Sequence, residues 1–503
     1  MVLALVLCGS SLSAESYSFL LDRAVVFSDE TANSTTSYAI HTNTEALDSS
    51  NAIAIEPGTT IQFLVERYPP GTKFVLKKGI HRLQRIIPKN GNSFVGESGA
   101  ILSGARELTE FIKKGKYWVI TGQTQQGQVH GKCQKLSNGH ESTGCRYPED
   151  LFRDDTVLVQ VTSLSDIGKD SWYFDYKNDS IYVADDPVGH KIETSITRHA
   201  FEGAAKDVTI RGLIIEKYAN PAQHGAIHVK HGQNWIVQDS EVRLNHGIGI
   251  RSGERLHVLR CHVHHNGQLG IGGFGDSILI QHNEISHNNT QQFRREWEAG
   301  GTKFVKTQNL IVRDNFVHHN QGPGLWTDID NINTLYERNR VEDNERAGIF
   351  HEISYAAIIR DNVVTRNGLG FPVWLWGSGI LVAASSDTEV YRNLVENNAD
   401  GIGAVQQKRG IGKYGPHLVK NLSVHDNVVS MTNGNTGLVQ DTDDMSCFTQ
   451  RNNRFEHNTY HLLENRKKYF LWMNRFQTFR EWQSYGHDTK GKLGHSSHAS
   501  STQ

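Results

Sequence analysis

The chain has 503 residues, of which 37% are hydrophobic, and its 52 lysines and arginines nearly balance 54 aspartates and glutamates. This balance gives no basic footprint, so nucleic acid is not suggested as a partner. No run of about 18 apolar residues occurs, so no membrane-spanning helix is expected. Glycine is frequent, with 47 residues, and proline is scarce, with 10. That combination indicates many tight corners between hydrogen-bonded strands.

The amino terminus resembles a secretory signal. An apolar run from Val2 to Cys8 is followed by small and serine residues before the first acid, Glu15, although no lysine or arginine precedes the run. We therefore predict a signal peptide over residues 1–14 and a secreted or periplasmic protein. The alternative is an ordinary hydrophobic strand or a misassigned start.

Two cysteines, Cys133 and Cys145, lie near each other along the chain in a polar, glycine-containing stretch. In an oxidising compartment they could close a loop, and free buried thiols are the equal alternative. Cys261 and Cys447 complete the set expected after cleavage, and no cysteine has metal-ligand spacing. The sequence therefore predicts no metal site.

Residues 50–104 have the pattern of first β-helix turns, starting with the segment 59–63. Residues 105–200 contain strand-like runs such as Thr156–Val161 and Trp172–Tyr176 without the later period. We interpret this stretch as an inserted antiparallel β domain, a sandwich or a sheet.

A repeat runs through residues 201–460. One phrase returns, consisting of a short apolar strand, a polar corner that usually contains asparagine, another short strand, and then His-Asn or Asn-Asn. The corner positions are 213, 240, 261, 283, 315, 339, 362, 393, 427 and 453, so the period is about 22 to 24 residues with three longer copies.

Apolar and polar residues alternate within each period, which is strand periodicity, and no helical stripe separates the strands. We therefore predict an all-β protein, a right-handed parallel β-helix of the pectate-lyase-like kind, with aliphatic ladders inside. The corner asparagines are expected to adopt the left-handed backbone and to stack on one another.

The end of the chain departs from the repeat. Residues 461–486, which include the aromatic segments 469–472 and 476–483, are predicted to form a cap with a helix, because an open end would expose apolar strands. The segment 487–503, rich in histidine, serine and lysine, is predicted to be disordered. The chain is expected to be a monomer.

Two acids occupy equivalent places in adjacent copies. Asp328 follows Asn315 at the same spacing along the chain as Glu352 follows Asn339. Stacked strands lie about 4.8 Å apart, so the two carboxyl groups should be about 5 Å from each other on the outer face. That separation matches a retaining glycosidase, and the close like charges should raise one pKa. A cation site or a solvated pair of acids is the alternative.

The longer copies flank these acids and could form the walls of a groove. The insertions at 293–303, 371–376 and 406–413 would supply polar groups and aromatic rings that stack on sugars. The predicted substrate-binding residues are Glu298, Lys303, Trp326, Asp330, His351, Trp374 and Trp376. Ordinary packing would explain the tryptophans equally well. Asp441 sits in a similar phrase about three coils away, too far to be a partner.

The segments 326–328 and 350–352 resemble the paired-acid motif of right-handed β-helix carbohydrate-active enzymes, closest to the β-xylosidase-type glycoside hydrolases with an inserted β-sandwich. The resemblance implies that Asp328 is the nucleophile and Glu352 the acid/base. The specific motif covers only the short stretch from Trp326 to Glu352, and the segment 351–355 departs from what true β-xylosidases would show.

The sequence thus favours a secreted retaining glycoside hydrolase acting on poly- or oligosaccharides without a cofactor. One alternative is a polysaccharide lyase on uronate-containing glycans, with Lys303 or His351 as the base and calcium as a possible cofactor. Another is a non-catalytic carbohydrate-binding or surface β-helix, because such folds host several functions.

Overall fold

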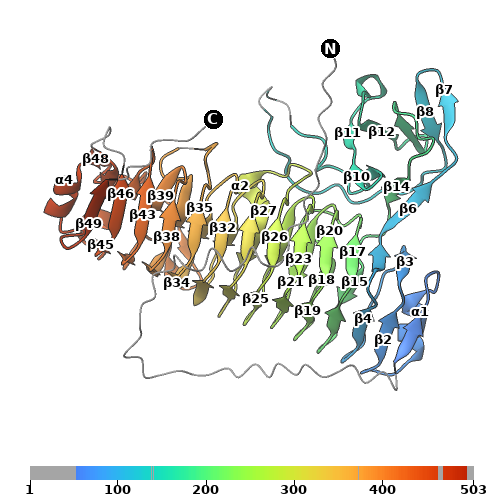
Figure 1. The fold of residues 1–503 in the computed structure, drawn as a ribbon, viewed down its shortest axis with the longest axis horizontal. Helices are drawn as coiled ribbons and strands as arrows, with labels where there is room; N and C mark the ends of the chain where they lie inside the picture. The colour runs from blue at the N-terminus through green and yellow to red at the C-terminus, as the bar shows by residue number, and fades with distance from the viewer. Residues whose placement is uncertain (1–51, 137–138, 140, 372, 463–467, 496–503) are drawn as a thin grey trace, which may run out of the picture. The chain divides into compact units, whose positions relative to one another are not determined.

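The computed structural model describes residues 52–136, 139, 141–371, 373–462 and 468–495, so the predicted signal peptide lies outside the described residues. Most of the described strands belong to three long sheets, here called A, B and C. Figure 1 shows successive strands of each sheet side by side. Apart from the last pair of sheet C, all neighbours within these sheets run parallel. No helix among the described residues is long and apolar enough to cross a membrane.

The strands of sheet A are β1 (Ile53–Ile55), β2 (Lys73–Leu76), β4 (Ser93–Gly96), β16 (Thr209–Arg211), β19 (Ile236–Gln238), β22 (His257–Leu259), β25 (Leu279–Gln281), β28 (Ile311–Arg313), β31 (Thr334–Glu337), β34 (Tyr355–Arg360), β37 (Ser386–Tyr391), β42 (Ser423–His425) and β45 (Arg454–Glu456).

The strands of sheet B are β3 (Gly79–Arg82), β5 (Ala100–Ser103), β17 (Ile214–Glu216), β20 (Glu241–Arg243), β23 (His262–His264), β26 (Glu284–Ser286), β29 (Phe316–His318), β32 (Arg340–Glu342), β35 (Val363–Thr365), β38 (Leu394–Glu396), β43 (Val428–Met431), β46 (Thr459–Leu462) and β49 (Lys492–His495).

The strands of sheet C are β15 (Phe201–Gly203), β18 (Gly225–Val229), β21 (Ile248–Ser252), β24 (Leu269–Gly273), β27 (Gly300–Val305), β30 (Leu325–Asp328), β33 (Ile349–Glu352), β36 (Ser378–Ala383), β39 (Asp400–Gln406), β44 (Thr436–Gln440), β47 (Phe470–Trp472) and β48 (Arg475–Gln477).

The interior of the solenoid is a stack of aliphatic side chains in strict register. In sheet B the central residue of each three-residue strand points inward and is buried. The register-matched series is Ile215, Val242, Val263, Ile285, Val317, Val341, Val364, Val395, Val429 and finally Tyr460. Burial of each such side chain stabilises the fold by about 1.5–3 kcal/mol relative to exposure. A shift of one residue would turn the whole series to the outer face, so the alternation of apolar and polar residues fixes the register.

Asparagines form two ladders, at the corner between sheets A and B and at the corner between sheets B and C. In each ladder the side-chain amide donates to the Oδ1 of the asparagine on the next coil, at 2.9–3.0 Å. The first ladder is Asn283, Asn315, Asn339, Asn362, Asn393, Asn427 and Asn458. The second is Asn245, Asn266, Asn288, Asn320, Asn344, Asn367 and Asn398. The prediction of one stack of asparagines therefore missed the second.

The predicted backbone role of these asparagines was wrong. The left-handed conformation belongs to the residue just before each ladder asparagine, for example Asp314 with φ 57°, Arg338 with φ 50° and Asp361 with φ 56°. The ladder asparagine itself is not in the left-handed conformation, and its side-chain amide points into the interior. The last predicted corner was also wrong, since Asn427 pairs with Asn458 and not with Asn453.

The inserted region consists of two sheets. One contains β6 (Ala105–Leu108), β9 (Leu151–Arg153), β10 (Thr156–Val157) and β14 (Ile192–Ser195). The other contains β7 (Ile112–Lys114), β8 (Tyr117–Ile120), β11 (Val159–Val161), β12 (Ser171–Asp175) and β13 (Ser180–Val183). Side chains from both sheets share one apolar core. The pair β11–β12 runs parallel, so the insertion is not wholly antiparallel as expected.

Buried polar contacts join this insertion to the coils. The Glu193 carboxylate, 1% exposed, pairs with Lys217 and, at 2.7 Å, with Arg82. Asp150 pairs with His246 at 3.0 Å and accepts a hydrogen bond from Gln291 at 2.8 Å. Buried charges left without such partners would destabilise the fold, so these contacts orient the insertion on the solenoid.

Helices occur at the first coil and at the end. Helix α1 (Ile61–Arg67) buries Ile61 and Val65 in the solenoid core, so the segment 59–63 leads into a helix and not a strand as expected. Helix α4 (Phe479–Ser484) starts with a capping box between Thr478 and Glu481. Trp482 from α4 is completely buried in the same core. Short helices α2 (Arg295–Glu298) and α3 (Ser446–Thr449) lie in insertions between strands.

Residues 487–495 are ordered, which contradicts the predicted disorder. Strand β49 pairs with β46, and Asp488 is buried. Its Oδ1 accepts from Asn458, and its Oδ2 accepts from Tyr460 and Trp482. Among the described residues, an aspartate thus ends the first asparagine ladder. Residues 496–503 lie outside the described residues.

Candidate active site

The paired acids come from adjacent strands of sheet C. Register matches Leu325 with Ile349 and Thr327 with His351, so Asp328 and Glu352 follow equivalent positions on β30 and β33. Leu325 and Ile349 point into the core, and Asp328 and Glu352 stand on the outer face, as alternation requires. Adjacent parallel strands lie about 4.8 Å apart, so the backbone positions that carry the two acids are about one strand spacing from each other.

Apolar residues flank the two acids along the sheet. The register partner of Asp328 on the preceding strand is Val305, and the partner of Glu352 on the following strand is Ala383. Each acid side chain is only 9% exposed. Two carboxylates therefore sit side by side in a largely apolar column, where each depends on a specific cation.

Lys303 is the cation that faces Asp328. Its Nζ lies 2.7 Å from Asp328 Oδ2 and 3.7 Å from the centre of the Trp326 ring, and it donates to the Trp297 carbonyl at 2.6 Å. Asp328 Oδ1 is buried and has no hydrogen-bond partner among the described residues. One oxygen of this carboxylate is thus held in place while the other carries an unused lone pair.

Arg409 is the cation that faces Glu352. Its guanidinium donates to Glu352 Oε1 at 2.6 Å from the long segment after β39. Burial raises the pKa of Glu352 above its ordinary value, the neighbouring Asp328 raises it further, and Arg409 opposes both effects. Glu352 therefore keeps its proton to higher pH than an ordinary glutamate does.

The segment that carries Arg409 is fastened to the site by the predicted residue Asp330. Asp330 Oδ1 accepts from the Lys413 backbone at 3.0 Å and lies 3.0 Å from His417 Nε2. The hairpin β40 (Ile411–Gly412) and β41 (Gly415–Pro416) passes so closely that a Cβ on Gly412 would lie 2.0 Å from that oxygen. Asp330 therefore positions this hairpin, which is the role its contacts support.

Aromatic rings pack beside the acids. Trp326 stacks on Phe350 with ring centres 5.5 Å apart, and Trp376 meets Phe350 edge-on at 6.1 Å. Trp326 is 2% exposed and Phe350 is 6% exposed, so these two rings form a covered apolar cluster. Trp374 is 54% exposed. Of the predicted tryptophans, only Trp374 presents a large open face.

Two other predicted binding residues have different surroundings. His351 is completely buried, faces the interior and shares a 2.8 Å hydrogen bond with Thr327, so its assignment to substrate binding was wrong. Burial lowers its pKa to about 3. Glu298 is half-buried and accepts from Gln223 at 2.6 Å, beside α2. The sequence analysis missed Arg409 and His417, although Arg409 lies in the insertion 406–413 that lengthens one copy of the repeat.

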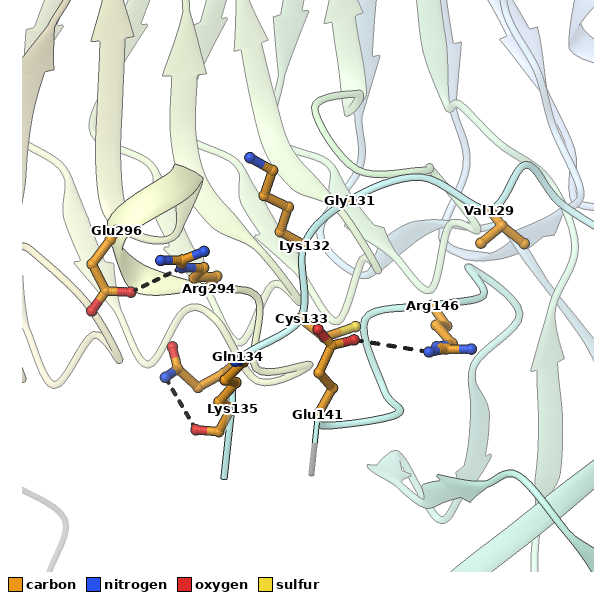
Figure 2. Close-up of a pocket in the computed structure, with 10 residues that line it drawn as sticks. All are labelled: Val129, Gly131, Lys132, Cys133, Gln134, Lys135, Glu141, Arg146, Arg294 and Glu296. Carbon is orange, nitrogen blue, oxygen red and sulfur yellow. Dashed lines mark hydrogen bonds and ion pairs between the residues drawn. The ribbon is translucent and has the colours of Figure 1, made fainter. Parts of the chain in front are cut away.

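A separate hollow lies on the insertion side of the coils (Figure 2). Its lining includes Cys133, which forms a disulfide with Cys145, together with Arg294 and Glu296 from the α2 insertion. Cys133 also forms an antiparallel bridge with Phe293. This bridge holds the loop closed by the disulfide against the segment 293–303, whose last residue is Lys303. The hollow does not include Asp328 or Glu352.

Comparison with known proteins agrees with this architecture. The sequence profile of the family described as right handed beta helix region matches residues 225–383. The solenoid is a right-handed parallel β-helix. The predicted fold class is thus confirmed.

Solved β-helix structures are similar at low sequence identity. XylC in complex with xylose is 14% identical, with 80% of each chain covered and a TM-score of 0.59. The A-module of the mannuronan C-5 epimerase AlgE6 from Azotobacter vinelandii is 13% identical, covering 80% of this chain and 88% of that chain with a TM-score of 0.44. A mannuronic acid specific polysaccharide family 6 lyase from human gut microbiota is 11% identical, covering 89% and 82% with a TM-score of 0.44. No curated protein matches the sequence.

Proposed function

We propose that this β-helix is a retaining glycoside hydrolase that acts on oligo- or polysaccharides. The observation that carries the proposal is the pair Asp328 and Glu352, on one face of adjacent strands and each facing its own cation. A separation of about 5 to 5.5 Å between carboxyl groups is typical of retaining glycosidases, whereas inverting enzymes need about 6.5–9.5 Å.

The environments of the two acids suggest their roles. Asp328 is paired with Lys303, and its carboxylate would attack the anomeric carbon. Glu352, with its raised pKa, would give its proton to the leaving oxygen as the glycosidic bond breaks. Water would then attack the glycosyl–Asp328 ester, and Glu352 would take the proton from that water.

The arrangement of Arg409 supports a change during binding. A glutamic acid that donates its proton to a sugar oxygen cannot keep the same oxygen in an ion pair with a guanidinium. The 2.6 Å contact of Arg409 with Glu352 would therefore be exchanged for a contact with the substrate. Arg409 lies on a half-exposed segment, so this exchange needs no change in the stacked strands.

The lyase alternative retains one of its two proposed bases. His351 faces the interior and cannot reach a bound uronate, which leaves Lys303. Lys303 is already paired with Asp328 and with the Trp297 carbonyl, so it serves more naturally as a fixed cation than as a base. A lyase would release an unsaturated product that absorbs ultraviolet light, and a hydrolase would not. A non-catalytic β-helix would release no product.

The site of action is proposed to be outside the cytoplasm. The Cys133–Cys145 disulfide fits an oxidising compartment, as does the predicted signal peptide. A monomeric protein with a saccharide as its partner is the simplest arrangement, and the proposed chemistry calls for no metal or other cofactor. Xylo-oligosaccharides are the first substrates to test, because XylC was solved with xylose.

Trapping of the covalent intermediate tests the proposal. A 2-deoxy-2-fluoro glycosyl fluoride of a sugar that the wild-type protein hydrolyses should add one glycosyl group, and peptide mass spectrometry should locate the group on Asp328. Asp441→Asn, in a similar phrase on an exposed position, should be labelled like the wild type. A label on another residue, or a product that absorbs in the ultraviolet, would contradict the proposed function.

A further inference from the structure

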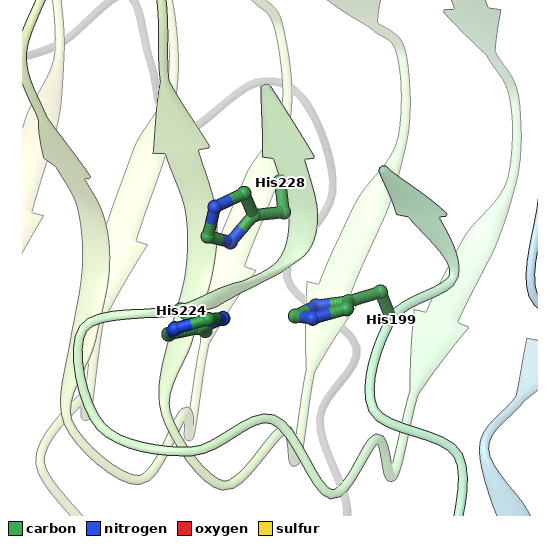
Figure 3. A group of neighbouring side chains, drawn as sticks. All are labelled: His199, His224 and His228. Carbon is green, nitrogen blue, oxygen red and sulfur yellow. The ribbon is translucent and has the colours of Figure 1, made fainter. Parts of the chain in front are cut away.

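Three histidines converge at the start of sheet C, away from the paired acids. One ring nitrogen of each, from His199, His224 and His228, lies within 4.8 Å of those of the other two. Figure 3 shows the three rings facing a shared space next to strand β18. His199 is 5% exposed, His228 is 6% exposed and His224 is half-buried. Nothing in the proposed hydrolysis uses these residues.

We propose that His199, His224 and His228 form a binding site for a late first-row divalent metal ion such as Zn²⁺. Three imidazoles with a fourth open position are a common zinc ligand set, and imidazole also suits Ni²⁺ and Cu²⁺. Calcium and magnesium prefer oxygen ligands and would not be retained by this set.

His199 already has the hydrogen bond that a metal-binding histidine requires. Its Nδ1 donates to the Gly225 carbonyl at 2.8 Å, which leaves the Nε2 lone pair for a metal. The carboxylate of Glu202 lies 3.9 Å from this Nε2 and could contribute an oxygen as a fourth ligand. A hydrogen-bond acceptor for the second ring nitrogen, here the Gly225 carbonyl, and a nearby carboxylate, here Glu202, commonly surround the ligands of a metal site.

His224 has a buried nitrogen without a partner. Its Nδ1 is shielded from solvent and has no hydrogen bond among the described residues. A buried polar atom without a partner is costly, and a metal bond would satisfy it.

His228 is the member that must rearrange. Its Nδ1 accepts from the Gly225 backbone at 3.2 Å, so coordination would exchange this long hydrogen bond for a metal bond. The ring nitrogens must also approach one another, because ligands about 2.0–2.1 Å from one zinc ion are closer together than 4.8 Å. Side-chain rotations would supply this movement, since His199 lies on a different segment from His224 and His228, which flank and belong to β18.

The site is distinct from the proposed active site. In sheet C the register runs from His228 to Arg251, Gly272 and Lys303 on successive strands. Three strand steps correspond to about 14 Å, too far for the metal to contact the paired acids. The metal would instead join the end of the inserted region at residue 199 to the first regular coils, as a structural site.

Zinc titration of the untagged protein provides the test. Calorimetry of the wild type should show one tightly bound equivalent of Zn²⁺, and the Co²⁺ form should show the visible bands of nitrogen-ligated cobalt. His224→Ala should weaken binding at least about tenfold, because loss of even an outer partner of a metal ligand costs about 10- to 100-fold. Thermal unfolding of the metal-free variant should match that of the wild type.

Two further variants separate this site from other histidines. His287 stacks between His265 and His319 on another face, so His287→Ala should keep the tight equivalent. His199→Gln retains a donor for the Gly225 carbonyl and should still lose the metal, which excludes misfolding as the cause. Absence of a tight equivalent in the wild type, its survival in His224→Ala, or its loss in His287→Ala would each overturn the proposal.

Discussion

The corners of the β-helix and the outer face of sheet C use the same register for opposite purposes. At the corners, coil after coil presents the same residue, and each asparagine repeats the hydrogen bond of its neighbour. On the outer face of sheet C, successive coils present Lys303, Trp326 and Phe350 in one column and Val305, Asp328, Glu352 and Ala383 in the next.

The difference shows how a repeat can carry a unique site. Identical groups in register stabilise the stack, because each satisfies the next. Unlike groups in register create a local environment, which among the described coils is the one that β30 and β33 provide for Asp328 and Glu352. Stability should therefore depend on the corners, and activity on the outer face, and the two should be separable by mutation.

The largest effect is expected from Asp328→Asn. Loss of the nucleophile should lower kcat/KM by about 10⁴-fold or more. Asn keeps the size of the side chain and can accept from Lys303, so the variant should fold, but loss of the negative charge opposite the buried Lys303 should lower its free energy of unfolding. Steady-state kinetics and urea unfolding measure both quantities. A variant with near-normal activity, or one that fails to fold, would break the proposed separation.

Glu352→Gln should have a smaller effect that depends on the leaving group. General acid catalysis contributes about 10²- to 10⁴-fold, so hydrolysis of unactivated oligosaccharides should fall by that factor. The leaving groups of aryl glycosides with acidic phenols need little protonation. The variant should therefore form the glycosyl–Asp328 ester from these substrates with a much smaller loss of rate. An equal loss for both kinds of substrate would assign Glu352 another role.

The ion pair of Arg409 with Glu352 should influence the pH above which activity is lost. Activity requires protonated Glu352, so kcat/KM should fall as pH rises through the raised pKa of this acid. Arg409 lowers that pKa, and Arg409→Gln should therefore move the alkaline limb to higher pH. Lys408→Gln, at the exposed neighbouring position, is the matched control and should leave the limb in place. A limb that moves to lower pH in Arg409→Gln would contradict the ion pair.

Asn339→Ala should show the reverse pattern to Asp328→Asn. It removes the acceptor of the buried Asn315 backbone and side-chain amides and one donor to Asn362, which should cost about 1–3 kcal/mol of unfolding free energy while kcat is retained. Arg338→Gln, in the exposed pair with Asp314 one residue away, should cost less than about 1 kcal/mol. A similar loss of unfolding free energy in both variants would show that the asparagine ladder contributes no more stability than a surface ion pair.

The smallest effect concerns acid stability at the stacked histidines. Burial and neighbouring imidazoles lower the pKa of His265 to about 4, and they lower that of His287 as well. Below about pH 6.5 the unfolded chain therefore binds more protons than the folded protein does. The free energy of unfolding should fall as the pH drops from about 6.5 to about 4. The melting temperature of His265→Gln should depend less on pH over this interval. An unchanged pH dependence would exclude a contribution from His265.

Much of the β-helix could be predicted from the sequence, since strand alternation and the period are local signals. The same phrase at Asp328 and Glu352 sufficed to place both acids in register on adjacent strands. The final corner was misplaced because Asn453 follows the local pattern, whereas the insertion with α3 shifts the true position to Asn458.

The parts that could not be predicted depend on contacts between distant segments. Arg409 reaches Glu352 across 57 residues, from an insertion without periodicity. The three histidines at 199, 224 and 228 belong to a linker, a loop and a strand, and nothing in their spacing indicates that they converge. His351 was misassigned even though the alternation that puts Glu352 on the outer face puts His351 inside, where it hydrogen-bonds to Thr327.

The parallel register has a further consequence for the evolution of this fold. A β-helix can gain or lose a whole coil almost anywhere without disturbing the ladders, because every coil presents the same corners. One junction is different, that between β30 and β33. An extra coil there would move the two carboxyl groups from about 5 to about 10 Å apart, beyond the reach of a double displacement. The proposed retaining outcome would thus depend on the number of coils, and duplication or deletion of a repeat should be tolerated only outside the coils from β27 to β39, which carry Lys303, the two acids and the segment of Arg409.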